Sequence, residues 1–384
     1  MRRFKIYWLM AVLIPSLAQA DLKFAIVAPQ TGGAALMGME MQQGISTYFA
    51  EVNAQGGVNG QPLTLVPFDD QYDPLKAARH TREVAADTSI LASIGNVGTP
   101  TAAVTVPIHN DEQMLLFGAF TGAGLLRRSP PDRYVINYRA SYAEETATMI
   151  SGLLEAGIEP EEIAFFTQND SFGDAGYNGA INALKAQGVT NAEHLAHGRF
   201  TRGTRNIHQG LAAILQAPVT PRAIIIVGTF GPAADFIREA REDLPDTLFL
   251  NVSFVGSQAL LNELGDKGEG VIVTQVVPPL DSALPAVESY RAALARHAGD
   301  AEPSFISLEG YLASRLFVEG IKAAGAAPDR ESIVDGLLSL ENVDIGLDAP
   351  LTLSADQHQA SHSVWPTVIR SGRFEPVDWT ALTP

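Results

Sequence analysis

Short apolar runs alternate with amphipathic stretches over most of the chain. In the first half the apolar runs are residues 22–28, 63–68, 90–94 and 115–117. Such short and nearly continuous runs are typical of parallel strands that are buried on both faces. A helical pattern covers about 39–52, and two more helices are predicted to begin at Pro74 and Pro100, directly after Asp73 and Thr99. The first half therefore predicts a parallel sheet with helical connections.

The same alternation restarts in the second half. Further strands are predicted at 163–166, 223–227, 248–250 and 271–273, and helices near 175–187, 206–215, 233–241, 286–297, 304–324 and 330–340. Residues 364–377 have the pattern of an antiparallel hairpin that turns at Ser371 and Gly372. We expect an α/β fold with two doubly wound parallel-sheet lobes. Such sheets bind ligands at the carboxyl ends of their strands, so the cleft between the lobes is the expected site.

The first twenty residues have the pattern of an export signal. Arg2, Arg3 and Lys5 precede an apolar run at 6–17, and small residues flank Gln19 at the predicted cleavage site. We expect cleavage after Ala20 and release into the periplasm. A membrane anchor is the alternative, but the run is shorter than the ~20 apolar residues that span a bilayer.

Charge and composition exclude several classes of binding partner. The formal net charge is −17 and there is no cysteine. An acidic surface repels nucleic acid and anionic lipid, so we expect no nucleic-acid partner and no membrane insertion. Without cysteine the chain has no disulfide, no thiolate metal site and no lipid anchor on cysteine. We therefore expect a free periplasmic monomer.

Loops that follow the predicted strands carry the candidate site. Thr99 stands where a helix begins, so its hydroxyl either caps that helix or helps to bind an anion such as a carboxylate. Phe120 and Thr121 lie in a loop of small residues that lets a ligand approach the backbone. Each of three later loops, at 169–173, 228–232 and 251–254, brings an aromatic residue to a strand end. These rings either pack beneath their own loops or form apolar walls around a ligand.

Several motifs are similar to one known family. They lie at 52–60 (Val-Asn-Ala-Gln-Gly-Gly-Val-Asn-Gly), 68–74 (Phe-Asp-Asp-Gln-Tyr-Asp-Pro), 77–87, 171–173 and 236–241. Over nearly all of the mature chain the sequence resembles the leucine/isoleucine/valine-binding proteins, the type I periplasmic binding proteins of ABC importers. The resemblance implies two lobes joined by crossovers near 139–142, 273–276 and 345–351. The implied division is a signal at 1–20, lobe 1 at 21–140 plus 275–348, and lobe 2 at 141–274 plus 349–384.

The resemblance also implies a binding site. In that family a ligand carboxylate is held at the positions of Thr99 and of the loop Phe120, Thr121 and Gly122, and Met37 packs on the ligand. The second lobe would contribute Phe172, Thr229 or Phe230, and Ser253.

Two departures from the family pattern bear on the ligand. Ser253 stands where family members that bind amino acids place a carboxylate for the ligand's ammonium, and Phe172 lacks the family's phenolic hydroxyl. A buried ammonium without a partner costs several kcal/mol, roughly enough to abolish binding. The hypothesis is therefore a small carboxylate or amide with an apolar body, unless Glu309 or Glu144 replaces the missing charge.

Other chemistry finds little support in the sequence. The histidine pairs His194/His197 and His358/His362 lack HExxH character, so we expect surface histidines and no metal or cofactor. No GxSxG elbow or P-loop is present, so we expect no catalytic residues. The predicted function is the solute-binding component of an ABC importer, which binds a small carboxylate-, amide- or amino-acid-type ligand in the cleft between the lobes and has a membrane permease as partner. A sensor for a membrane receptor or kinase and a hydrolase on a similar scaffold are the alternatives.

Overall fold

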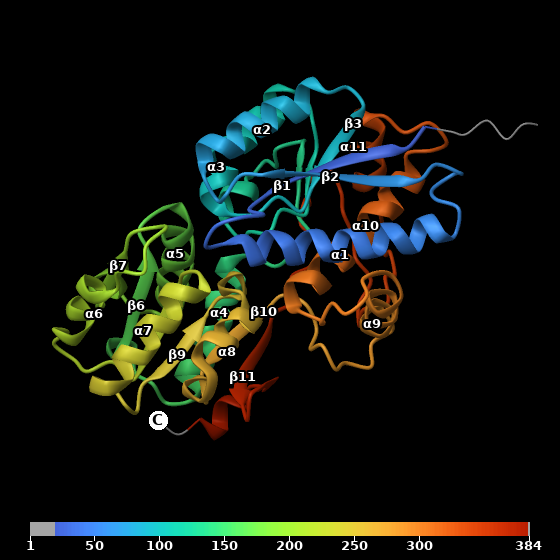
Figure 1. Cartoon of the computed structure of the whole chain (residues 1–384). Helices are drawn as coiled ribbons and strands as arrows, with labels where there is room; N and C mark the ends of the chain where they lie inside the picture. Colours follow the sequence, from blue (N-terminus) through green and yellow to red (C-terminus); the bar gives the residue numbers. More distant parts are fainter. Residues whose placement is uncertain (1–19, 383–384) are drawn as a thin grey trace, which may run out of the picture.

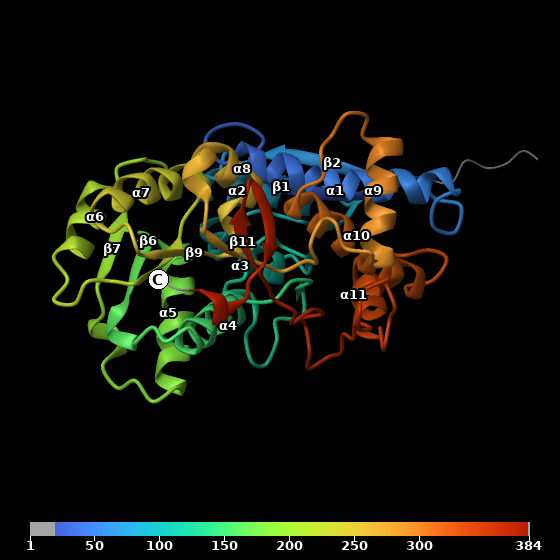
Figure 2. The same cartoon turned by 90° about the horizontal axis from the view of Figure 1, so that it is seen from below.

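A computed structural model describes residues 20–382. The expected export signal lies outside the described residues, apart from Ala20. Two separate sheets divide the described chain into two lobes (Figure 1). Viewed from below, α5, α6 and α7 lie at one end of the molecule and α9, α10 and α11 at the other (Figure 2). The α/β fold with two parallel-sheet lobes is therefore confirmed.

The sheet of the first lobe is parallel throughout. Its strands lie in the order β2-β1-β3-β4-β5. Their bounds are β1 Leu22–Ala28, β2 Leu63–Asp69, β3 Ile90–Ile94, β4 Leu116–Phe117 and β5 Val135–Ile136. Six helices cover it: α1 Ala35–Ala54, α2 Pro74–Ala86, α3 Thr99–Asp111, α9 Pro285–His297, α10 Phe305–Ala323 and α11 Arg330–Leu338.

Alternate residues of β1 face the two helical layers of this lobe. Phe24 points toward α1 and α10, where its ring centroid lies 5.8 Å from that of Phe49 and 4.9 Å from that of Phe317. Ala25 and Val27 instead pack in a smaller cluster with residues of α2. Both faces of the strand are buried, which is why its sequence is almost continuously apolar.

The second lobe has a mixed sheet of order β12-β11-β10-β9-β8-β6-β7. Its strands are β6 Ile163–Gln168, β7 His197–Phe200, β8 Ala223–Val227, β9 Leu248–Asn251, β10 Ile272–Gln275, β11 Trp365–Arg370 and β12 Arg373–Pro376. Its helices are α4 Tyr142–Glu155, α5 Ser171–Ala186, α6 His208–Leu215, α7 Phe230–Asp243 and α8 Ser257–Leu264. The strands β11 and β12 are antiparallel and turn at 371–372, as the sequence predicts.

The chain stays beside the first lobe beyond Leu351. After an antiparallel bridge between Val343 and Leu351, the chain continues beside β5 of the first lobe. The amide of Asn137 donates to the carbonyl of His358 at 2.7 Å, and Ala360 donates back to Asn137 at 3.0 Å. Residues up to about 361 therefore extend the first lobe, because these backbone groups complete their hydrogen bonds at its sheet edge.

Two histidines expected at the surface are buried. His109 is fully buried, and its Nδ1 lies 3.0 Å from the carbonyl oxygen of Met114. His358 is buried beside the carbonyl of Val135, at the same distance of 3.0 Å. A hydrogen bond to a backbone carbonyl satisfies each ring inside the protein, so the expectation was wrong for both.

Within residues 20–382, none of the helices combines the length and apolar character needed to cross a bilayer.

Candidate ligand-binding cleft

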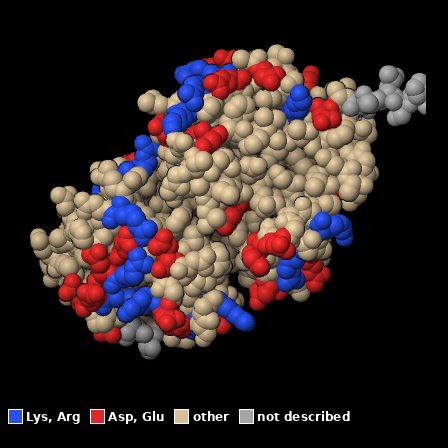
Figure 3. Space-filling model, viewed as in Figure 1, with Lys and Arg blue, Asp and Glu red and all other residues tan. Residues whose placement is uncertain are grey.

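A cleft of about 580 Å³ opens where the two lobes face each other. The first lobe lines it with residues 32–34 and 71–73, which follow β1 and β2. The second lobe lines it with Gln168 and with residues 202–205 and 229–232, at the ends of β6, β7 and β8. The cleft therefore lies at the carboxyl ends of parallel strands. Charged side chains gather on the second lobe in Figure 3, whereas the surface over α1 is largely uncharged.

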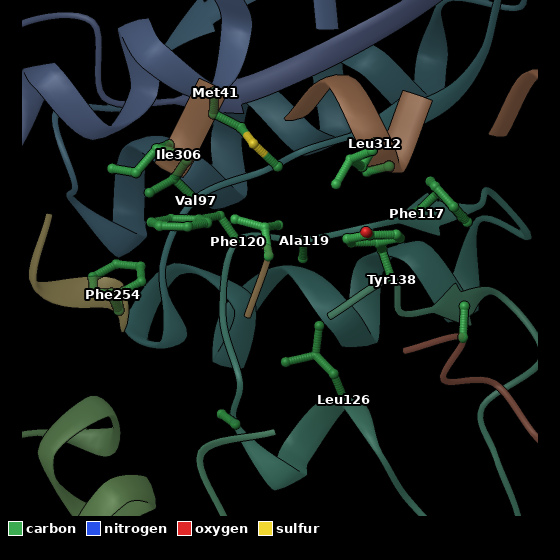
Figure 4. Packing of buried hydrophobic residues seen from close by; sticks show 14 of the residues in the cluster. Met41, Val97, Phe117, Ala119, Phe120, Leu126, Tyr138, Phe254, Ile306 and Leu312 are labelled. Atoms are coloured by element: carbon green, nitrogen blue, oxygen red, sulfur yellow. The ribbon is translucent and has the colours of Figure 1, made fainter. Parts of the chain in front are cut away.

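An aromatic cluster lies deeper between the lobes. Phe254, in the short 3₁₀ helix Ser253–Val255, stacks on Phe120 of the first lobe with centroids 5.0 Å apart and planes at 27° (Figure 4). Its centroid lies 4.7 Å from that of Phe172, at the start of α5, and 6.2 Å from that of Tyr72. Phe120, Phe172 and Phe254 are all buried. The rings of both lobes thus form one apolar surface.

Two threonine hydroxyls meet beside these rings. The Oγ1 atoms of Thr99 and Thr121 lie 2.6 Å apart, and both residues are fully buried. Gly98, not Thr99, is the N-cap of α3, and no side chain caps this helix. The capping role considered for Thr99 is therefore wrong, and its hydroxyl faces the loop that carries Phe120.

Backbone contacts hold the two loops in this arrangement. Gly98 donates to the carbonyl of Phe120 at 3.2 Å, and a side chain at Gly98 would clash with the ring of Tyr72. Gly122 accepts a hydrogen bond from the amide of Tyr142 at 2.8 Å, and a side chain at Gly122 would clash with that residue. Gly122 thus allows the start of α4 to approach the hydroxyl pair.

A buried ion cluster adjoins the aromatic rings. Arg139 is fully buried, and its Nη2 lies 3.0 Å from Oε1 of Glu145 while its Nη1 lies 3.6 Å from Oε1 of Glu309. The guanidinium also lies 5.1 Å from the ring centroid of Phe120 and bonds to the hydroxyl of Ser253. Glu145 accepts hydrogen bonds from the amide of Ser253 at 2.7 Å and from Thr274 Oγ1 at 2.6 Å.

Glu145 therefore places a carboxylate directly beside Ser253. Its hydrogen bonds are already used by Arg139, Ser253 and Thr274. Of the two replacements considered, Glu309 lies beside Arg139, whereas Glu144 bonds to Ser141, Gln359 and His362.

Burial shifts several pKa values in this region. Burial raises the pKa of Glu309 to about 7, against the opposing effect of Arg139. Burial acts to lower the pKa of Arg139, but Glu309 and Glu145 raise it above its ordinary value. Burial also raises the pKa of Tyr142 to about 12. The arginine is therefore a permanent cation, and the tyrosine stays a neutral hydroxyl.

Two of the remaining predicted site residues, Thr229 and Phe230, lie in the open cleft. Thr229 is the N-cap of α7 and makes no side-chain cap bond, and both Thr229 and Phe230 line the cleft. A Cβ built on Gly256 would lie 3.5 Å from the ring of Phe230 and 3.7 Å from Cε of Met37. Both side chains therefore approach Gly256, one from each lobe. The predicted residues form a buried inner group around Thr99 and an outer group around Phe230.

Sequence reasoning missed Tyr72, Arg139, Tyr142 and Glu145 as parts of this region. Tyr72 lies in a motif used only for the resemblance, and Arg139 in an implied crossover. One signal was present for Glu145, since Ser141 and Glu144 form a capping box that predicts the helix carrying it.

Two lobes that face each other across a cleft at their strand ends define the type I class of periplasmic binding proteins. The family model described as "Periplasmic binding protein" matches residues 21–373, and the chain belongs to this family, among the Leu/Ile/Val-binding proteins.

Solved structures and relatives agree with this placement. The crystal structure of a possible leucine/isoleucine/valine-binding protein from Rhodopirellula baltica SH 1 is 42% identical, with a TM-score of 0.92 over 97% of this chain and 100% of that one. A substrate-binding periplasmic protein from Ralstonia solanacearum is 26% identical, with a TM-score of 0.84 over 92% and 100%. The leucine-specific-binding protein of Salmonella typhimurium is 25% identical over 66% of this chain and 67% of its own. The relatives support a solute-binding role.

Proposed function

We propose that this chain is the exported solute-binding component of an ABC importer, and that its ligand is a small carboxylate or amide with an apolar body. The observation that carries the proposal is the hydroxyl pair of Thr99 and Thr121 beside the rings of Phe120, Phe172 and Phe254. A permease in the membrane would be the partner of the closed form.

The hydroxyl pair suits a carboxylate or an amide. Thr99 is the first residue of α3, whose N-terminal amides and dipole favour an anion. Each threonine hydroxyl can donate one hydrogen bond. A ligand oxygen placed between them would replace the bond that joins them at 2.6 Å. The adjoining rings offer apolar contact on both sides of the ligand's body.

The ion cluster disfavours an ammonium group. Glu145 is neutralised by Arg139 and saturated by the hydrogen bonds of Ser253 and Thr274. An ammonium placed near Ser253 would face the guanidinium of Arg139. Several relatives are named for leucine or for leucine, isoleucine and valine, whose free amino acids carry such an ammonium. We infer that the ligand of this chain differs from those amino acids in having no ammonium group at the end near Ser253.

The proposed binding residues are those expected from the sequence, namely Met37, Thr99, Phe120, Thr121, Gly122, Phe172, Thr229, Phe230 and Ser253. We add Tyr72, Tyr142 and Phe254 because they complete the aromatic cluster. Ser253 would act through Glu145 and Arg139. We also propose the division into lobes as predicted, with the last boundary moved to about 361 by the hydrogen bonds of Asn137.

A thermal-shift screen tests the proposal. Purified mature protein is heated with free amino acids, with monocarboxylates of matched size and with their amides. We expect carboxylates or amides, and not amino acids, to raise the melting temperature. At a ligand concentration of 100 times the dissociation constant, the free energy of unfolding should rise by about 2.7 kcal/mol. Stabilisation by leucine alone would overturn the ligand assignment, and stabilisation by no solute would overturn the binding role.

A further inference from the structure

The outer cleft has more room and more polarity than one carboxylate with an apolar tail requires. Its volume of about 580 Å³ is well within the range of roughly 300–1,000 Å³ for pockets that hold drug-sized ligands. The hydroxyl pair at Thr99 and Thr121 is not among its lining residues. Tyr72 belongs both to this lining and to the aromatic cluster beside the pair, so a ligand whose acidic end reaches the pair would extend past Tyr72 into the outer cleft.

One arginine in this outer cleft has an unused donor. Arg202 lies after β7, and its Nη1 is buried without a hydrogen-bond partner. Its Nε lies 3.7 Å from Oδ2 of Asp170. Asp170 also accepts hydrogen bonds from Gln168 at 2.8 Å and from the amide of Phe172 at 3.0 Å. The negative charge of Asp170 is therefore divided among three donors and only partly neutralises Arg202. Arg202 thus keeps positive charge and a donor for a further acceptor.

The neighbouring arginine differs. Arg205 also lines the cleft, but it bonds to both carboxylate oxygens of Asp235 and to Glu263. The carboxylate of Asp73, on the opposite wall, is engaged as the cap of α2 by the amide of Leu75 at 2.8 Å. Of the two arginines that line the cleft, Arg202 is therefore the one whose positive charge is less neutralised by neighbouring carboxylates.

Two more groups converge on the same space. Tyr72 is 9% exposed, and its hydroxyl lies beside Gln168 without completing a hydrogen bond. The helix α7 begins at Phe230 in this lining, and Thr229 provides no side-chain cap, which leaves the amides of Phe230 and Gly231 for a ligand, since Pro232 has none. An anion between the lobes could then bind a guanidinium, a phenol and a helix N-terminus together.

We propose that the ligand carries a second carboxylate at the end away from Thr99, and that Arg202 and Tyr72 bind it in the outer cleft. This inference rests on the proposed function, because it assumes that the first acidic end lies at the hydroxyl pair. It assigns the ligand to the dicarboxylates with an apolar middle. Contact with Arg202 on one lobe and Tyr72 on the other would also favour the closed form.

Calorimetry with matched pairs tests the inference. Benzoate is compared with terephthalate, and hexanoate with adipate, each against the mature protein. We expect one dicarboxylate to bind about tenfold or more tightly than its monocarboxylate, as a charged hydrogen bond predicts. Arg202→Gln and Tyr72→Phe should each reduce that preference. Arg222→Gln is the matched control, since Arg222 pairs with Glu162 at 3.1 Å, outside the lining of the cleft.

The outcomes separate the two proposals. Binding of a monocarboxylate as tight as that of its dicarboxylate would overturn the second carboxylate while the proposed function stands. A dicarboxylate preference that persists in both Arg202→Gln and Tyr72→Phe would overturn the assigned residues. Absence of binding by all four acids, in protein with a native circular dichroism spectrum, would count against both proposals.

Discussion

Phe254 of the second lobe stacks on Phe120 of the first, with ring centroids 5.0 Å apart. Both rings are buried, and Phe254 also contacts Phe172 of its own lobe. A single ring therefore belongs to the packing of both lobes. Because an aromatic pair contributes about 0.5–1.5 kcal/mol beyond its buried area, this contact helps to determine how far the lobes close.

Replacing Phe254 should loosen the contact between the lobes. We expect Phe254→Ala to weaken ligand binding and to increase the radius of gyration in small-angle X-ray scattering, because the first lobe loses its apolar partner. Phe254→Leu keeps an apolar side chain and should have a smaller effect. Phe172→Ala should weaken closure while the fold is retained. An unchanged scattering curve for Phe254→Ala would show that other contacts hold the lobes together.

Removing the hydroxyl of Thr99 should weaken a carboxylate ligand. Thr99→Val keeps the shape of the side chain but cannot donate to the ligand or to Thr121, its partner at 2.6 Å. We expect a loss of about 1–3 kcal/mol in binding free energy, measured by calorimetry. Thr99→Ser is the control and should retain most of the affinity. Equal dissociation constants for the valine variant and the wild type would remove Thr99 from the site.

The fold could be predicted where local pattern determines it. The strand Leu22–Ala28 is bounded as its apolar run predicts, because both of its faces are covered. Four strands or helices were not predicted: β5, β7, α4 and α8. The strand β7, His197–Phe200, is short and half polar, so it has no strand-like pattern. The helix α8 follows Gly256 in the left-handed region and spans only eight residues, which gives periodicity little to detect.

The site could be predicted only in part, because some of its contacts join residues that are far apart in the sequence. Thr99 and Phe120 follow strand ends, so their meeting follows from the topology. The pairing of Arg139 with Glu145, and of Glu145 with Ser253 108 residues later, depends on how the lobes fold against each other. No spacing in the sequence encodes that contact. The hydrogen bond from the amide of Ser253 likewise becomes visible only in three dimensions.

Breaking the buried ion cluster should destabilise the protein strongly. Glu145→Gln leaves Glu309, at 3.6 Å, as the remaining carboxylate of the ion cluster around Arg139. We expect the free energy of unfolding, measured with urea, to fall by about 3–5 kcal/mol. Replacing Arg139 by Met and Glu145 by Leu together should restore much of this loss. Glu144→Gln, one residue earlier, is the control and should cost about 1 kcal/mol or less, because Glu144 is partly exposed.

A loss equal to that of Glu144→Gln would show that Glu145 contributes no more than a surface carboxylate.

Stability should decline with rising pH because two buried carboxyl groups resist ionisation. Burial raises the pKa of Asp70 and of Glu309 to about 7 in the folded protein. Both values lie above the ordinary ones, so this stabilisation is complete below about pH 4 and is lost as the pH rises through 7. We expect Asp70→Asn to reduce the decline between pH 4 and 7 by roughly 1–3 kcal/mol, measured by urea unfolding.

Asp69 provides a neighbouring control. Burial acts to raise the pKa of Asp69, but hydrogen bonds from Thr31, Gln30 and Gln71 lower it below its ordinary value. Asp69→Asn should therefore change the slope between pH 4 and 7 much less than Asp70→Asn does, and only by removing a negative charge that adds to the raised pKa of Asp70. An equal slope in Asp70→Asn and the wild type would contradict the assignment of a raised pKa to Asp70.

The most direct test compares leucine with 4-methylpentanoate, the same molecule without its ammonium group, by titration calorimetry. If the hydroxyls of Thr99 and Thr121 hold the acidic end while Glu145 stays occupied by Arg139, the acid should bind and leucine should bind far more weakly. Tight binding of leucine with little or no binding of 4-methylpentanoate would contradict this account.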